Sequence, residues 1–190
     1  MRLGVMGGTF DPIHLGHLRA AESARSELGL ERVVFVPART PPHREPPVAS
    51  AWDRFAMVAV ATAGHDAFVA SEIELEREGP SYTVDTIAAL REDGGEDPVL
   101  IVGADSFAEM AGWKDAKRLL ALCSVAVVPR PGASVANALG ATGARVLVLE
   151  GPALPISSTE IRRRVAERRS IHYFVPTVVA EYVEKRGLYR

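Results

Sequence analysis

Short apolar runs alternate with helical patterns along this 190-residue chain, and the alternation limits the fold more than any other feature. Residues 99–102 and 125–128 are continuously apolar, which is typical of parallel strands buried on both faces. Between such runs, apolar residues recur with helical spacing. Strands separated by helices form parallel sheets through right-handed crossovers. We therefore expect an α/β fold, a doubly wound parallel sheet with helices on both faces.

The pattern predicts strands and helices in turn. Strands are expected at residues 2–6, 32–36, 68–73, 99–102, 125–128 and 145–149. Helices are expected at residues 18–28, 83–90, 158–168 and 176–186, with others running toward Ala63 and over 132–143. Gly29 stands at a helix stop position, and Ser50 with Asp53 resembles a capping box. The chain shows no repeats and is long enough for a full core, so one domain over residues 1–190 is expected.

A glycine-rich turn that carries two histidines follows the first predicted strand. It reads Gly-Gly-Thr-Phe-Asp-Pro-Ile-His-Leu-Gly-His over residues 7–17. Glycines let the backbone approach a phosphate, and a helix N-terminus offers unpaired N–H groups and a positive dipole end. His14 and His17 add donors that can be cationic near neutral pH, and Gly16 leaves room for a nucleotide beside the backbone. The combination points to phosphoryl or nucleotidyl transfer.

Composition argues against several other classes of protein. The net charge is −2, so no global field attracts nucleic acid, and no apolar stretch reaches membrane-spanning length. A single cysteine, Cys123, excludes an internal disulfide and a cysteine-rich zinc site. The chain does not open on a charged segment followed by a long apolar run, so a cytoplasmic protein is expected. The oligomeric state is not set by the sequence, and a homo-oligomer is compatible with it.

Further motif blocks follow the histidine motif in order. They are Pro-Pro-His-Arg at 41–44, Gly-Pro-Ser-Tyr-Thr-Val-Asp-Thr at 79–86, Gly-Ala-Asp at 103–105 with Trp113, Pro129-Arg130, Ile-Ser-Ser-Thr-Glu-Ile-Arg at 156–162 and Gly-Leu-Tyr at 187–189. In this order they resemble the bacterial nicotinate mononucleotide adenylyltransferases, which are HxGH nucleotidyltransferases. The resemblance covers nearly the whole chain. It implies a Rossmann-like nucleotidyltransferase fold and transfer of AMP from ATP to nicotinate mononucleotide, forming nicotinate adenine dinucleotide and pyrophosphate in NAD biosynthesis.

The resemblance also implies an ATP site. Its implied catalytic residues are His14, His17 and Arg162. The residues implied to bind ATP are Gly7, Gly8, Thr9, Phe10, His17, Asp105, Arg130, Ser158, Thr159 and Arg162. Taken alone, each block also fits a structural role. The glycines fit an ordinary turn, Asp11 a loop start, Asp105 a helix N-cap, 157–162 a cap with a solvated arginine, and the histidines a zinc pair or surface groups.

A second group of residues is implied to hold nicotinate mononucleotide, namely Arg44, Tyr82, Thr83 and Trp113. An indole can stack on a pyridine ring, and a hydroxyl with backbone N–H groups can receive a carboxylate. By resemblance, this region selects the acid over the amide. Core packing for Trp113 and a capped helix start for Tyr82 and Thr83 are the structural alternatives. The family usually has lysine where Arg44 stands and often arginine where His172 stands, so contacts at these two positions differ from the family pattern.

Adenylyl transfer to a phosphate needs no general base. A phosphate monoester is largely dianionic near neutral pH, because its second pKa is about 6. Catalysis then depends on positioning and charge stabilisation, and no covalent enzyme intermediate is expected. Mg²⁺ is expected to arrive with the ATP phosphates, since the sequence has no acidic cluster at ligand spacing.

Three other functions stay open at this point. They are an adenylyltransferase for nicotinamide mononucleotide or phosphopantetheine, a nucleotide-binding sensor without turnover, and a Rossmann dehydrogenase. Residues 82–83 with Trp113 argue against phosphopantetheine, and the intact histidines with Arg162 argue against a sensor. The turn lacks a full GxGxxG pattern, which argues against the dehydrogenase.

Overall fold

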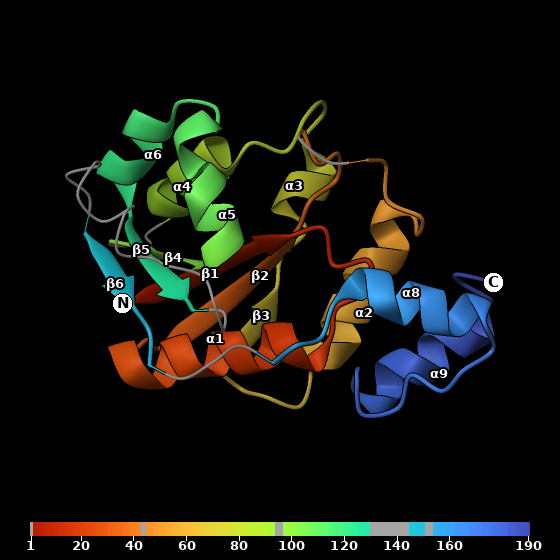
Figure 1. Cartoon of the computed structure of the whole chain (residues 1–190). Helices are drawn as coiled ribbons and strands as arrows, with labels where there is room; N and C mark the ends of the chain where they lie inside the picture. Colours follow the sequence, from red (N-terminus) through yellow and green to blue (C-terminus); the bar gives the residue numbers. More distant parts are fainter. Residues whose placement is uncertain (1, 43–44, 94–96, 130–144, 151–153) are drawn as a thin grey trace.

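The described part of the chain builds one six-stranded sheet, in which all neighbouring strands are parallel (Figure 1). The computed structural model describes residues 2–42, 45–93, 97–129, 145–150 and 154–190. The strands are β1 Leu3–Gly8, β2 Arg32–Pro37, β3 Phe68–Ala70, β4 Val99–Gly103, β5 Ser124–Val128 and β6 Val146–Val148. Their order is β3-β2-β1-β4-β5-β6, so the chain starts in the middle and winds outward in both directions. The expected doubly wound α/β fold is confirmed.

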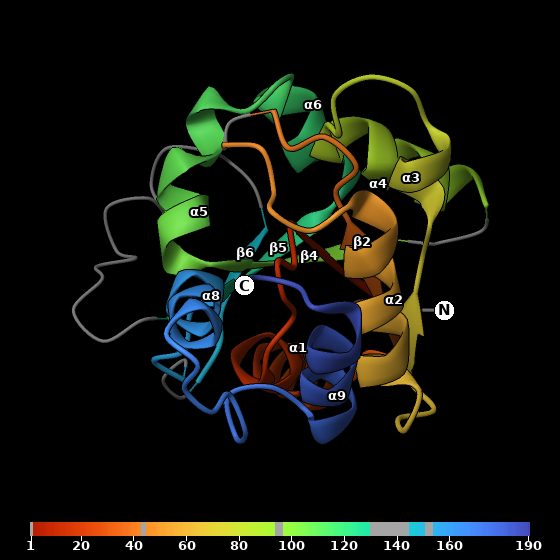
Figure 2. The same ribbon diagram turned by 90° about the vertical axis from the view of Figure 1, so that its right-hand side faces the viewer.

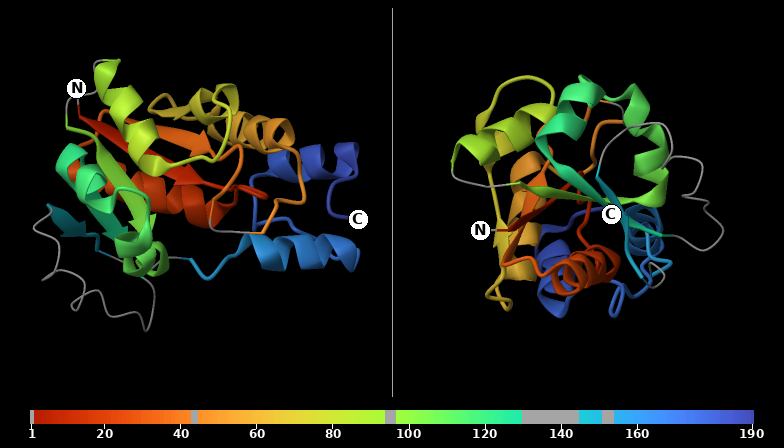
Figure 3. Two further views of the ribbon diagram at one scale, coloured as in Figure 1. Left: turned by 90° about the horizontal axis from the view of Figure 1, so that it is seen from above. Right: turned by 90° about the vertical axis from the view of Figure 1, so that its left-hand side faces the viewer.

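Helices cover both faces of the sheet (Figure 2). One face packs against α1 Leu15–Leu28, α2 Ala51–Thr62, α8 Ser158–Ala166 and α9 Thr177–Arg186. The other face packs against α3 Ile73–Glu76, α4 Thr83–Glu92, α5 Ala104–Glu109, the 3₁₀ turn η1 Met110–Gly112 and α6 Ala116–Leu122. Seen from above, α8 and α9 extend beyond the carboxyl ends of the strands (Figure 3). The last two helices therefore stand beside the sheet edge where such folds bind ligands.

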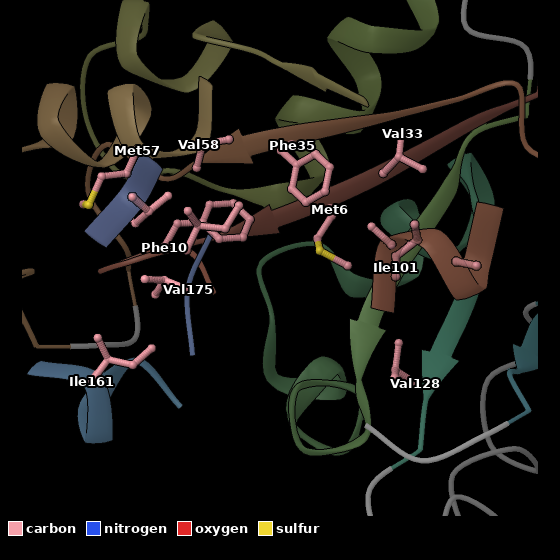
Figure 4. Packing of buried hydrophobic residues seen from close by; sticks show 14 of the residues in the cluster. Met6, Phe10, Val33, Phe35, Met57, Val58, Ile101, Val128, Ile161 and Val175 are labelled. Carbon is pink, nitrogen blue, oxygen red and sulfur yellow. The ribbon is translucent and has the colours of Figure 1, made fainter. Parts of the chain in front are cut away.

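Side chains on the central strands alternate between two apolar cores. In β2, Val33 and Phe35 join the core under α1 and α2, whereas Val34 and Val36 join the core under α4 and α6. Figure 4 shows the first core, which includes Phe35 of β2 and Val58 of α2. The period of two is that of an extended strand, and both faces are covered. This explains why the strand runs are continuously apolar in sequence.

Most predicted elements are confirmed with shifted ends. The helix α1 begins at Leu15 rather than at residue 18, and it ends before Gly29 as predicted. Gly29 has φ of 61°, a left-handed conformation that a residue without Cβ adopts at little cost. Ser50 caps α2, because its hydroxyl accepts a hydrogen bond from the Asp53 N–H at 3.1 Å and donates to the Asp53 carboxylate at 2.6 Å.

The strand predicted at 68–73 is wrong over its second half. Only Phe68–Ala70 pairs with β2, and the helix α3 begins at Ile73. The chain turns there because the N–H groups of Leu75 and Glu76 both bond to the Glu72 carbonyl, at 2.7 and 3.1 Å. The short helices α5 and α6, of six and seven residues, were not predicted. The helix predicted at 132–143 lies outside the described residues.

Asp53 links α2 to α9. Its carboxylate accepts hydrogen bonds from the Ser50 hydroxyl, from the Tyr182 hydroxyl at 2.9 Å and from Arg186 Nε at 3.1 Å. These donors, the Ser50 hydroxyl first among them, hold the pKa of Asp53 below its ordinary value. The ionised carboxylate therefore stabilises the packing of the two helices.

Replacing Asp53 with asparagine should lower the free energy of unfolding by about 2 kcal/mol near neutral pH, because charge-assisted hydrogen bonds are lost. The folded-state pKa of Asp53 is lowered, so its contribution is present above the unfolded value of about 4 and disappears as the pH falls below it. Urea titrations from pH 7 to pH 3 should show the gap between variant and wild type narrowing. The control Asp66→Asn, at an exposed position, should stay within about 0.5 kcal/mol throughout. A gap that does not change with pH would contradict the assignment.

Candidate functional site

The histidine motif lies at the carboxyl end of β1, in the middle of the sheet. β1 is flanked by β2 and β4, so the turn stands where the strand order reverses, which is the usual ligand position in open α/β sheets. The Ala38 N–H donates to the Gly8 carbonyl at 2.9 Å, so the segment that leaves β2 begins beside the turn. Gly7 is exposed, and Gly8 and Thr9 are half-buried. Their backbone is therefore accessible at this edge.

His14 and His17 lie against each other at the start of α1. Their ring centroids are 3.7 Å apart and the ring planes differ by 20°, while the Phe10 ring meets His17 edge-on at 5.0 Å. The His14 N–H donates to His17 Nδ1 at 3.3 Å, so the neutral His17 ring carries its proton on Nε2. His14 is 6% exposed and His17 is half-buried. His17 is thus the more accessible of the two imidazoles.

Gly16 is required by the packing of the His14 ring. A Cβ at position 16 would lie 2.9 Å from His14 Nδ1 and 3.0 Å from its Cε1, which is closer than carbon atoms tolerate. The sequence suggested that this glycine leaves room for a nucleotide. The structure shows that the missing Cβ makes room for the histidine ring, and the expected room for a nucleotide stays a prediction.

The start of α8 docks on the same turn. Ser158 Oγ donates to the Pro12 carbonyl at 2.9 Å, and Arg162 Nη1 donates to the Asp11 carbonyl at 2.8 Å. Arg162 Nη2 lies 3.5 Å from Thr159 Oγ1, so these two side chains share one face of the helix. Residues from both ends of the sequence are therefore brought together, along with the N-terminal ends of α1 and α8.

Asp11 is the centre of these contacts, which go beyond the loop start that is the structural alternative for this residue. Its side chain is 4% exposed, and its carboxylate accepts hydrogen bonds from the N–H groups of Val48 and Ala49 at 2.8 and 3.1 Å and from the Tyr189 hydroxyl at 2.8 Å. Arg162 Nη1 lies 3.8 Å from Asp11 Oδ2. The carboxylate thus ties the segment before α2, α8 and the C-terminal tyrosine to the turn.

Tyr82 and Trp113 lie on the opposite face of the sheet from the histidine helix. Both are half-buried and pack against the core under α4 and α6, and Lys114 Nζ lies 4.4 Å from the centre of the Tyr82 ring. Tyr82 is the N-cap residue of α4, but its side chain makes no capping bond. Core packing therefore explains why part of the Trp113 side chain is buried. Helix capping does not explain the position of the Tyr82 side chain, because that side chain makes no capping hydrogen bond.

A buried carboxylate supports the segment before α4. Glu74 is 6% exposed and accepts hydrogen bonds from Thr86 Oγ1 at 2.5 Å and from the Ser81 hydroxyl. Ser81 Oγ in turn accepts from the N–H groups of Arg39 and Thr40, at 2.9 and 3.3 Å. Burial raises the pKa of the Glu74 carboxyl, although these hydroxyl donors oppose the rise. The network joins the start of α4 to the segment that leaves β2.

Comparison with known proteins places this arrangement in a family. Residues 5–164 match the cytidylyltransferase-like family. The chain belongs to that family. The probable nicotinate-nucleotide adenylyltransferase of Thermus thermophilus is 47% identical over 191 residues, which cover 100% of both chains. That of Acidothermus cellulolyticus is 45% identical and covers 100% of this chain and 94% of the relative. The resemblance identified from the motif blocks is confirmed.

Solved structures of other proteins share the fold at much lower sequence identity. The Plasmodium falciparum nicotinic acid mononucleotide adenylyltransferase, described as complexed with NaAD, superposes with a TM-score of 0.84. It is 17% identical and covers 99% of this chain and 97% of its own. This likeness shows that the chain shares the fold of that protein over nearly its whole length.

The remaining predicted site residues differ in how far the structure places them. Asp105 is exposed in the first turn of α5, and the N-cap residue is Gly103, so the N-cap alternative for Asp105 is wrong. Phe10 is 2% exposed and its ring lies in the core, so the ring does not face a ligand. His172 is exposed. Arg44 and Arg130 lie outside the described residues, and their roles stay predictions.

The described residues contain no group of three or more His, Cys, Asp or Glu side chains that could hold a metal ion. Cys123 is buried, and burial raises its thiol pKa to about 12, so it is protonated near neutral pH. Among the described residues, no His, Cys, Asp or Glu side chain therefore completes a metal site with His14 and His17. In the same described residues, no helix has both the length and the apolar composition of a membrane-spanning segment.

Replacing Tyr189 with phenylalanine keeps the ring but removes a donor from the buried Asp11 carboxylate. The free energy of unfolding should fall by about 1–3 kcal/mol at neutral pH. Burial and the Asp11 charge raise the pKa of Tyr189, so its contribution is present below the unfolded value of about 10 and is lost as the pH rises above it. Urea titrations should show the gap to wild type narrowing from pH 9 to pH 11. Tyr173→Phe, at a side chain that is 90% exposed, is the control and should match wild type. Equal stability of Tyr189→Phe and wild type would exclude the buried hydrogen bond.

Proposed function

We infer that the protein transfers the adenylyl group of ATP to nicotinate mononucleotide, forming nicotinate adenine dinucleotide and pyrophosphate in NAD biosynthesis. One observation carries the inference. The start of α8, with Ser158 and Arg162, docks on the histidine turn in a chain 47% identical over its full length to a probable nicotinate-nucleotide adenylyltransferase. The convergence of two helix N-termini with imidazole and guanidinium donors suits a polyphosphate.

The proposed reaction needs charge stabilisation more than proton transfer. An oxygen of the mononucleotide phosphate forms a bond to the α-phosphorus of ATP, and the bond from that phosphorus to the bridging oxygen of pyrophosphate breaks. The attacking phosphate is already largely dianionic near neutral pH. The protein therefore has to hold two anionic substrates in line and stabilise the charge that develops on the phosphate oxygens.

We assign the donors in this step to the turn and to α8. His17 is the accessible imidazole and His14 stacks on it, so both are proposed to face the ATP phosphates, with His17 as the principal donor. Arg162 adds a guanidinium whose position is fixed by the Asp11 carbonyl. The backbone at residues 7–10 and the hydroxyls of residues 158 and 159 complete the proposed phosphate site, and Asp105 is proposed to contact a ribose.

The acceptor site is proposed at the start of α4. The hydroxyl of Thr83 and the N–H groups at the very start of α4 suit a carboxylate, and Trp113 offers a surface for an aromatic ring. The Lys114 ammonium near the Tyr82 ring adds positive charge to this region. These features favour the carboxylate of nicotinate over the uncharged carboxamide of nicotinamide. Arg44 is proposed to contact the same substrate.

Enzymes that transfer nucleotidyl groups from ATP generally use a divalent metal. We propose Mg²⁺, which prefers to bind through phosphate oxygens and water and so can enter with ATP. The donor set fits this mode, since the described residues offer no acidic cage and the turn offers cationic and N–H donors to the remaining phosphate oxygens. Bound to the phosphates, the metal neutralises charge. The proposed location is the cytoplasm, where ATP and mononucleotides meet.

The acid should be preferred over the amide by about 10- to 100-fold in kcat/KM, because one charge-assisted hydrogen bond is worth about 1.5–3 kcal/mol. Pyrophosphate release is measured with ATP and Mg²⁺, with nicotinate mononucleotide and nicotinamide mononucleotide offered in parallel. Equal use of both would keep the reaction and remove the assignment of the acceptor site. No release with either would favour a nucleotide-binding sensor.

The substitution His17→Ala should lower kcat by about 100-fold or more, which is the usual effect of losing one transition-state donor. The matched control is His65→Ala. The His65 ring stacks on Phe68, which is the first residue of β3. His65 therefore lies at the amino end of that strand, whereas the proposed site lies at the carboxyl ends of the strands. The control should retain wild-type kcat. A near-normal rate for His17→Ala would overturn the role assigned to this imidazole.

A further inference from the structure

Arg54 is a buried cation whose guanidinium, among the residues that the structure describes, donates its hydrogen bonds to main-chain oxygens near the site. It lies on α2 with 1% of its surface exposed. Its guanidinium donates to the carbonyl of Thr9 from Nη1 at 2.7 Å, of Arg39 from Nη2 at 3.2 Å and of Ala49 from Nε at 3.3 Å. Burial lowers the pKa of this guanidinium, while the charge of Asp11 opposes the fall, and the group stays charged at neutral pH.

All three carbonyls belong to segments that lie beside the proposed ATP site. Thr9 belongs to the histidine turn. Arg39 and Ala49 lie near the two ends of the proline-rich segment 38–49, whose middle carries Arg44. One planar group thus fixes three points on two loops. Because a trans peptide directs its C=O and N–H in opposite directions, holding the Thr9 carbonyl toward α2 directs the Phe10 N–H away from it.

These contacts require a side chain that carries several donors. An apolar residue in the same interior space would leave three main-chain carbonyls without this donor, at about 1–3 kcal/mol each, which is comparable with the several kcal/mol that burying the charge costs. Lysine could not replace the contacts, since its ammonium is a single point, whereas the guanidinium presents donors in a rigid plane.

We propose that Arg54 is a positioning residue for adenylyl transfer, which holds the histidine turn and both ends of segment 38–49 in the relative placement that the reaction requires. It acts through the main chain and does not touch the substrates. The proposal rests on the proposed function, because the loops it joins are those assigned to ATP and to the acceptor.

The test compares Arg54→Lys and Arg54→Met with Met57→Ala. Met57 is fully buried on the same helix and lies within the core shown in Figure 4, so its truncation destabilises the same region without touching the loop carbonyls. All three variants should unfold at lower temperature than wild type. At a temperature where each is folded, both Arg54 variants should lose about 100-fold in kcat/KM for ATP, shared between kcat and KM, as expected when reacting groups shift by about 1 Å. Met57→Ala should stay within about threefold of wild type in both constants, because it leaves the loops in place.

Activity loss that follows stability loss equally in the Arg54 and Met57 variants would overturn the proposal, and so would failure of both Arg54 variants to fold. Wild-type turnover separates this outcome from failure of the proposed function. If the wild type releases no pyrophosphate, ATP affinity measured by calorimetry takes the place of turnover. Arg54→Lys should then bind ATP about tenfold more weakly while Met57→Ala binds normally, as expected if Arg54 shapes the phosphate turn. Normal binding by both variants would again overturn the proposal.

Discussion

The buried carboxylate of Asp11 is the constraint on which the site depends. A buried charge is stable only when donors surround it, and Asp11 receives two main-chain N–H groups, the Tyr189 hydroxyl and the nearby Arg162 guanidinium. These donors come from the segment before α2, from α8 and from the C-terminal residues. Displacing any of them leaves a buried acceptor unsatisfied, at about 1–3 kcal/mol. Satisfying one side chain therefore assembles distant parts of the chain around the turn.

The segment between β2 and α2 is held by charges of both signs. Asp11 accepts the Ala49 N–H while Arg54 donates to the Ala49 carbonyl, so position 49 is fixed from two sides. At the other end, the Arg39 N–H bonds to Ser81, which the Glu74 carboxylate supports. The segment is thus anchored at both ends beside the histidine turn. Rigid anchors flanking a loop with charged residues are the usual way in which a scaffold presents a functional loop.

How much of the fold is predictable from the sequence depends on how many residues carry the signal. Strands β4 and β5 were predictable because both their faces are buried, and most of α1 because residues 18–28 form a helical pattern that ends at Gly29. The short β3 was overextended because the apolar Ile73 that follows it belongs to a helix of only four residues. The helices α5 and α6 were not predicted because six and seven residues are too few to show a helical period in the sequence. The expectation of a single domain over the whole chain stays a prediction.

The same reasoning separates two kinds of site residue. His14 and His17, or Thr159 and Arg162, are close in sequence, and helical spacing alone brings each pair together. Asp11, Arg54 and Glu74 look like solvated surface residues, because charged side chains are seldom buried. Asp11 meets Val48 and Tyr189 across 37 and 178 residues, and the Arg54 guanidinium bonds to main-chain carbonyls, which any residue would supply. No local pattern can encode such contacts. The groups proposed to act on phosphates can therefore be identified from their spacing, whereas the buried groups that hold the surrounding segments emerge only from the folded chain.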